Sequence, residues 1–176
     1  CYIERARLVE GFDRSSHMLE RCAGNLSPWR DKLSLRVAEH RALPIAPGRA
    51  DIFVEGWAFG HAVGDEPRAV ARVTGELVDE ARRVVRPGGA VIFVETLGTN
   101  VTAAAAPLNA LGEFYALLEG RYGFRREVIR TDYEFASPDE AAATCAFFFG
   151  PDMAEAVRQR KSPIVPEFTG VWWATS

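Results

Sequence analysis

The sequence has no long apolar run, few cysteines and no excess of basic residues, and each absence excludes a class of protein. No run approaches the ~20 apolar residues of a membrane-spanning helix, so we expect no membrane partner. The three cysteines, Cys1, Cys22 and Cys145, are widely spaced and form no Cys-x-x-Cys pair. They predict neither a disulfide scaffold nor a metal site, and they favour a reducing cytoplasm.

The balance of charged residues indicates which class of binding partner to expect. The chain carries 21 Lys and Arg residues against 24 Asp and Glu residues, a formal net charge of -3. A nucleic-acid-binding domain usually presents a basic face, so a small molecule is favoured over nucleic acid. The pattern gives no indication of the oligomeric state.

The apolar content is high enough for one large core. The chain has 176 residues, of which 48% are hydrophobic and 26% charged, and this predicts a single folded domain over residues 1–176. The chain starts at Cys1 rather than at methionine, and it shows no signal peptide. We therefore expect it to be the remainder of a longer chain.

Strands and helices alternate in the predicted secondary structure. Apolar or alternating runs predict strands at 8–13, 33–37, 52–54, 90–94, 129–135 and 168–174. Caps and 3.6-residue periodicity predict helices at 14–25, 65–86, 108–120, 137–149 and 151–160. This alternation predicts an α/β sandwich around a mainly parallel sheet. The run at 90–94 is apolar throughout, as in a strand covered by helices on both faces.

Candidate functional residues follow the strands, because ligands of such sheets bind beyond the carboxyl ends of the strands. Asp13 ends the first predicted strand, where its carboxylate could accept hydrogen bonds from two ribose hydroxyls or cap the next helix. Glu39 follows the second strand and could accept a hydrogen bond from an adenine amine, or be a solvated loop acid. The residue types alone leave these alternatives open.

Residues 56–61 combine two aromatics, two glycines and a histidine after a strand. Aromatic rings can contact a flat or cationic ligand, and glycines let the backbone approach it closely. His61 could take a proton near neutral pH. The alternative is that Trp57 and Phe59 belong to the core and that His61 is an ordinary loop residue.

Four segments together resemble a class I S-adenosylmethionine-dependent methyltransferase. Residues 9–19 are similar to the family's second strand, which ends on a ribose-binding acid before a helix. Residues 38–44 resemble the acidic loop that ends in Leu-Pro. Residues 50–54 resemble the fourth strand, and residues 84–95, with their Arg-Pro-Gly-Gly turn, resemble the entry into the fifth strand.

The resemblance implies a Rossmann-like, doubly wound seven-stranded sheet of order 3-2-1-4-5-7-6, with strand 7 antiparallel. The family's first strand and Gly-x-Gly-x-Gly loop have no counterpart here, so we expect an N-terminally truncated domain with that strand missing and with weakened cofactor affinity. The residue pattern agrees with this order in one respect. The order places residues 33–37 and 129–135 at the edges of the sheet, and both runs alternate apolar and polar residues.

The resemblance also implies S-adenosylmethionine as the cofactor. The implied cofactor-binding residues lie after the first three strands: Asp13, Arg14, Met18, Glu39, His40, Gly56 and Trp57. Within this set, Asp13 would bind the ribose and Glu39 the adenine amine, while Gly56 and Trp57 would lie near the methionine part. His61 is the candidate catalytic base, and Tyr115 and Tyr133 are further candidates for the acceptor pocket.

We therefore expect an enzyme that transfers a methyl group from S-adenosylmethionine to a small-molecule acceptor. A dinucleotide-dependent oxidoreductase is one alternative, because it also uses an acid after its second strand. A catalytically inactive, methyltransferase-like binding or partner subunit is another. The Leu-Pro loop and the Arg-Pro-Gly-Gly turn favour the methyltransferase over the oxidoreductase.

Overall fold

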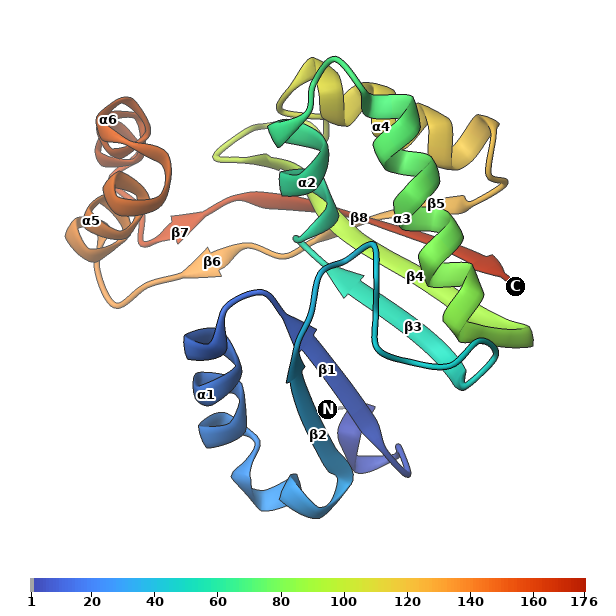
Figure 1. Cartoon of the computed structure of the whole chain (residues 1–176). Helices are drawn as coiled ribbons and strands as arrows, with labels where there is room; N and C mark the ends of the chain where they lie inside the picture. The colour runs from blue at the N-terminus through green and yellow to red at the C-terminus, as the bar shows by residue number, and fades with distance from the viewer. Residues whose placement is uncertain (1) are drawn as a thin grey trace.

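A computed structural model describes residues 2–176 of the chain (Figure 1). Its strands are β1 (Val9–Asp13), β2 (Leu33–Val37), β3 (Ala50–Gly56), β4 (Val85–Thr99), β5 (Arg125–Arg130), β6 (Tyr133–Glu134), β7 (Ile164–Val165) and β8 (Glu167–Thr175). Its α-helices are α1 (Ser16–Asn25), α2 (Phe59–Asp65), α3 (Val70–Val84), α4 (Asn109–Gly120), α5 (Pro138–Phe149) and α6 (Pro151–Arg160). Short 3-10 helices span Tyr2–Glu4 and Ser27–Lys32.

The strands form a central mixed sheet and two smaller ones. The central sheet has the order β3-β4-β8-β5, in which β3 and β4 are parallel and β8 is antiparallel to both β4 and β5. β1 and β2 form a separate parallel pair, and β6 pairs with β7. The predicted α/β class is confirmed. Among the described residues β1 and β3 are not paired with each other, and the β1–β2 pair lies beyond β3, away from β4 (Figure 1).

The main core lies between the central sheet and three helices on one of its faces, α2, α3 and α4 (Figure 1). α3 points Val73, Leu77 and Val84 into this core, at the three- and four-residue spacing predicted for its apolar face. β4 points Val91 and Phe93 into it. The alternate residues of β4 on the other face are only half-buried, so the expectation that this strand is covered on both faces is wrong for the described residues.

The predicted helix over 65–86 is wrong at both ends. Asp65 ends α2 and α3 starts only at Val70. At the other end, the Pro-Gly-Gly segment does not follow the helix as a turn but forms the first part of β4. The reason is tertiary: Gly88 N donates to Ser176 O at 2.8 Å and Ser176 N donates to Gly89 O at 2.9 Å. A Cβ on Gly89 would lie 2.6 Å from the carbonyl oxygen of Asp51, so the close approach requires glycine here.

The hairpin of α5 and α6 extends from the central sheet on β6 and β7 and has a small core of its own (Figure 1). Residues 137–140 have the pattern of a capping box, and half of it is present: Glu140 N donates to Ser137 Oγ at 3.1 Å, while the Glu140 carboxylate accepts from Ala136 N at 2.8 Å instead of from Ser137 N. The single strand predicted at 129–135 is divided into β5 and β6. Between them Arg130 and Asp132 form an ion pair, and Glu167 N donates to Asp132 Oδ1 at 3.0 Å.

None of the described helices is long and apolar enough to cross a bilayer.

Candidate functional site

Asp13 lies at the carboxyl end of β1, opposite Val37 at the end of β2. Its carbonyl oxygen accepts a hydrogen bond from Ala38 N at 3.1 Å, which ties the start of the 38–45 loop to the end of β1. Its Oδ1 accepts from Ser15 N at 2.8 Å, and Ser15 in turn caps α1. The N-cap of α1 is therefore Ser15 and not Asp13, and Asp13 uses one of its two carboxylate oxygens to hold the Ser15 backbone.

Two predicted cofactor residues follow on the exposed start of α1. Arg14 is exposed, and the Met18 side chain is 53% exposed. Met18 N donates to Ser15 Oγ at 3.3 Å, which fixes the first turn of the helix. An exposed thioether beside Asp13 is available to cover one face of an adenine ring.

The loop after β2 carries Glu39 and His40. Glu39 is exposed, and its carbonyl oxygen accepts from Ala42 N at 3.2 Å, so the backbone turns tightly here. The His40 ring meets the Phe59 ring edge-on at 5.6 Å. Burial lowers the pKa of His40, and Arg14 lowers it further, while Glu39 and Asp13 act in the opposite direction. His40 is therefore neutral at pH 7 and is electrostatically coupled to three other predicted site residues.

Polar contacts with α3 hold the far end of this loop. Leu43 N donates to Glu80 Oε1 at 2.6 Å. The Arg83 guanidinium donates to Ile45 O at 2.7 Å and to Leu43 O at 3.0 Å, and it is ion-paired with Glu80. The loop is thus fixed to the helix by hydrogen bonds to its backbone, in addition to the partly buried Leu43 and Ile45 side chains that pack against the main core.

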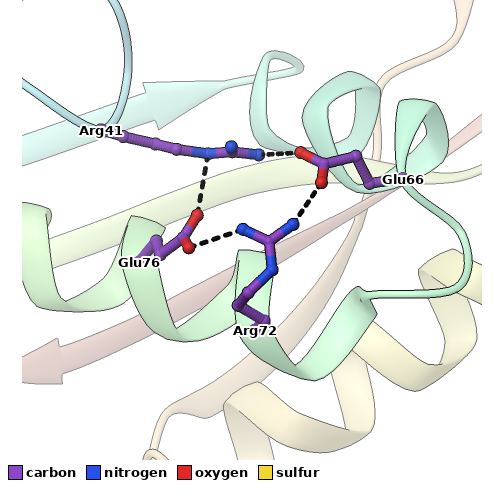
Figure 2. A network of polar contacts seen from close by, with 4 residues as sticks. All are labelled: Arg41, Glu66, Arg72 and Glu76. Carbon is purple, nitrogen blue, oxygen red and sulfur yellow. Dashed lines mark hydrogen bonds and ion pairs between the residues drawn. The ribbon is translucent and has the colours of Figure 1, made fainter.

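A ring of four charged side chains fixes the middle of the loop to α2 and α3 (Figure 2). Arg41 pairs with Glu66 at 2.6 Å and with Glu76 at 3.2 Å. Arg72 completes the ring by pairing with Glu76 at 2.6 Å and with Glu66. The hydrogen bond from Arg41 is the main cause that lowers the pKa of Glu66. All four side chains are at least a third exposed, so the ring orients the loop more than it stabilises the fold.

The turn after β3 contains the last group of predicted residues. Gly56 ends β3, and Trp57 N donates to Val94 O at 2.8 Å. Trp57 adopts a left-handed backbone with φ +53°, a conformation that is costly for a residue with a bulky side chain. Its side chain is 47% exposed, so the alternative that placed it in the core is wrong, whereas Phe59 is a core residue. His61 is exposed and lies in α2 rather than in a loop.

Two buried glutamates pack under this turn, at the starts of the runs 55–61 and 95–99 that follow strands, and the sequence assigned a role to neither. Glu55 Oε1 accepts from Ala58 N at 2.6 Å and from Phe59 N at 3.0 Å, and Glu95 Oε1 accepts from Gly60 N at 2.6 Å. The signal was present in the strand pattern. Glu95 follows Val91 and Phe93 at alternate positions, and alternate residues of a strand share a face. A carboxyl group on that buried face needed an explanation.

The structure brings the predicted segments into one chain of contacts at the carboxyl ends of β1, β2 and β3. Asp13 bonds to the start of the 38–45 loop, and His40 of that loop contacts Phe59 next to the Trp57 turn. Two cavities, of about 390 and 300 Å³, lie elsewhere and include none of the predicted cofactor residues or His61.

The two tyrosines considered for the acceptor pocket lie apart from this edge and from each other. Tyr115 lines the cavity of about 300 Å³ and donates from its hydroxyl to Thr96 O at 2.9 Å. Its ring stacks on Trp172 at 4.4 Å. Burial raises its pKa, so the hydroxyl stays protonated. Tyr133 lies on β6, toward the α5–α6 hairpin.

A family model described as a methyltransferase domain matches residues 2–93, more than half of the chain. The chain belongs to the methyltransferase-domain family. No curated protein matches the sequence. Neither the oxidoreductase nor the inactive-subunit alternative is supported by these comparisons.

Solved structures show the same fold at low sequence identity. The YcgJ protein from Bacillus subtilis has a TM-score of 0.60 at 10% identity, over 98% of this chain and 83% of its own. A putative methyltransferase from Bacillus halodurans has a TM-score of 0.53 at 15% identity, over 95% and 82%. Phospholethanolamine N-methyltransferase 2 from Haemonchus contortus, solved with phosphomonomethylethanolamine and S-adenosylhomocysteine, has a TM-score of 0.52 at 14% identity, over 96% and 43%. The fold is that of class I methyltransferases.

Proposed function

We propose that this methyltransferase binds S-adenosylmethionine across the carboxyl ends of β1, β2 and β3 and transfers its methyl group to a small-molecule acceptor. One observation carries the proposal. Three segments that are far apart in sequence meet here: the Asp13–Ala38 hydrogen bond joins the end of β1 to the 38–45 loop, and the His40–Phe59 contact joins that loop to the turn after β3. We assign the nucleoside and its methionine chain to this edge.

The groups at this edge fit the chemistry of the cofactor. Asp13 and Glu39 supply carboxylate oxygens, which accept from ribose hydroxyls and from the adenine amine. His40 is neutral and adds no positive charge next to the adenine ring. A Cβ on Gly56 would meet nothing within 4 Å, so the backbone there is open to the methionine part. The Trp57 side chain is exposed beside it and can contact a cationic sulfonium.

The chain's own part in catalysis is to bind and align. The cofactor, when bound, supplies a methyl group already activated by the positive charge on its sulfur. Asp13 and Glu39 fix the nucleoside, and Trp57 keeps water from the reacting end. His61 is exposed on the first turn of α2, four residues after Trp57, where its imidazole can take a proton from an acceptor that is protonated at working pH.

We also propose that the central sheet and the β1–β2 pair belong to one seven-stranded layer in the order β2-β1-x-β3-β4-β8-β5, where x is a single further strand. The observed order β3-β4-β8-β5 with β8 antiparallel agrees with this arrangement. On β3, which has no partner among residues 2–176 on the side away from β4, Ile52 and Val54 are 59% and 50% exposed. An apolar strand with an unpaired edge is a ready template for another strand.

The nature of the acceptor and the compartment follow from weaker observations. An acidic chain without a basic stripe favours a small acceptor over nucleic acid. Cys22 and Cys145 are free thiols, which fits a cytoplasmic protein.

Calorimetric titration with S-adenosylmethionine tests the cofactor site. Asp13→Ala should weaken binding by about 1–3 kcal/mol, because the ribose hydroxyls lose their acceptor. Asp31→Ala is the matched control, since Asp31 is an exposed acid on the 3-10 helix Ser27–Lys32. Equal affinities of the two variants would remove Asp13 from the site.

A further inference from the structure

Glu55 and Glu95 together hold three consecutive backbone amides at the start of α2. Glu55 Oε1 binds the amides of Ala58 and Phe59, and Glu95 Oε1 binds that of Gly60. The two carboxyl groups come from the ends of adjacent parallel strands, where Glu55 is in register with Phe93 and Glu95 lies two residues further on. The turn that carries Trp57 and leads to His61 is therefore anchored from below by this pair.

The surroundings of the pair offer no cation. Glu55 is 5% exposed and Glu95 is 2% exposed. Among the residues that the structure describes, neither forms an ion pair with an arginine, lysine or histidine. Tyr115 from α4 is electrostatically coupled to both glutamates, which raise its pKa, and it is coupled to Glu167 from β8 as well. A protonated phenol cannot neutralise a second negative charge.

Two buried carboxylates without a counter-ion cannot both stay ionised near neutral pH. Glu55 Oε2 has no partner unless Glu95 is protonated and donates to it. Burial is the main cause that raises the pKa of both groups. It raises the pKa of Glu55 to about 7, where the amide hydrogen bonds from Ala58 and Phe59 oppose the rise, and that of Glu95 to about 9, where the negative charge of Glu55 adds to the rise. Glu55 also accepts two amide hydrogen bonds against one for Glu95, which places the proton on Glu95.

We propose that Glu55 and Glu95 are positioning residues that share one proton and hold the Trp57–His61 turn in its binding conformation. When the shared proton is lost, two negative charges face each other and the amide anchors of the turn weaken. The consequence for ligand binding rests on the function proposed above, because it assumes that this turn contacts the cofactor. The shared proton itself does not depend on that function.

Two measurements on the unsubstituted protein and on Glu95→Gln test the shared proton and its effect on ligand binding separately. The first is carboxyl ¹³C NMR titration of the protein and of Glu95→Gln. We expect one glutamate of the pair to keep its proton at pH 7 and to lose it only at alkaline pH. In Glu95→Gln the amide donates permanently to Glu55, so this titration should vanish. If both carboxyl groups titrate near pH ~4–5, as ordinary glutamates do, the proposal that they share a proton is wrong.

The second measurement is the affinity for S-adenosylhomocysteine from about pH 6 to about pH 9. For the unsubstituted protein we expect the affinity to fall about tenfold over this range, since a shift of one pKa unit between the free and bound states changes affinity tenfold. For Glu95→Gln we expect an affinity that does not change with pH. Glu155→Gln, an exposed site on α6, should keep the unaltered profile. A flat profile for the protein would overturn the positioning role. Absence of binding by every form at every pH would instead refute the proposed function and leave the NMR result to decide the proton.

Discussion

The part of the molecule that buries the core and the part that carries most of the proposed nucleoside site are different regions. From Val70 to Val84, α3 contributes eight buried residues, whereas no residue between Glu4 and Val54 is buried. The first region is held by apolar packing. The second, with β1, β2 and the 38–45 loop, is held mainly by backbone hydrogen bonds and charged side chains, with only partly buried apolar side chains such as Leu43 and Ile45. The proposed binding residues lie on the less tightly packed region, and such regions can adjust around a ligand.

Truncating one leucine in each region should give the largest difference between them. Leu77 is fully buried, so Leu77→Ala should cost about 2–5 kcal/mol of unfolding free energy. Leu35 on β2 is only half-buried, and Leu35→Ala should cost clearly less. Chemical denaturation measures both. Equal costs would mean that the β1–β2 region packs as tightly as the core.

The stability that Glu80 provides, by joining the 38–45 loop to α3, should depend on pH. Glu80→Ala leaves Leu43 N without its acceptor and Arg83 without its carboxylate partner, so we expect a loss of about 1–3 kcal/mol of unfolding free energy at pH 7. The hydrogen bond from Arg83 lowers the pKa of Glu80 below its ordinary value of 4.5. Its stabilisation is therefore present above that pH and is lost as the pH falls through the folded-state pKa.

Denaturation at several pH values tests this sign. The difference between the protein and Glu80→Ala should shrink on acidification, whereas Asp79→Ala, an exposed neighbour on α3, should differ little at any pH. The Glu55–Glu95 pair has the opposite sign, because raised carboxyl pKa values make stability fall as the pH rises from about 4.5 toward 9. A Glu80 contribution that grew in acid would contradict the ion pair with Arg83.

The charged ring should give the smallest effect on stability and a local effect on the loop. Arg41→Gln removes two of the four contacts in Figure 2, yet the side chains are exposed enough that the unfolding midpoint should hardly move. Amide hydrogen exchange in the 38–45 loop should become faster, and cofactor affinity should fall. Arg158→Gln, which breaks an exposed pair on α6, should change neither. Unchanged exchange in Arg41→Gln would remove the ring from the positioning of the loop.

The sequence predicted features that depend on local pattern and missed those that depend on distant contacts. The alternation at 33–37 has the same bounds as β2, and Ser137 caps the start of α5 as expected. The Pro-Gly-Gly segment was interpreted as a helix stop because its pairing with Ser176 cannot be seen locally. The Glu55–Glu95 contact was missed for the same reason, since only the register of β3 on β4 joins the two residues.

The candidate site was predictable to a similar extent. The positions of Asp13 and Glu39 after their strands follow from the pattern, and the family match covers both. The left-handed Trp57 backbone and the exposure of its side chain do not follow from the sequence pattern. The turn is set by hydrogen bonds that its backbone amides donate to buried carboxyl groups. A contact between His40 and Phe59 likewise needs the folded arrangement of two loops.

A crystal structure of the protein with S-adenosylhomocysteine tests the central claim most directly. The account predicts the ribose hydroxyls on the Asp13 carboxylate, the adenine amine next to Glu39, and the homocysteine chain along Gly56 and Trp57. A ligand bound in the cavity beside Tyr115 instead, with Asp13 and Glu39 untouched, would contradict it.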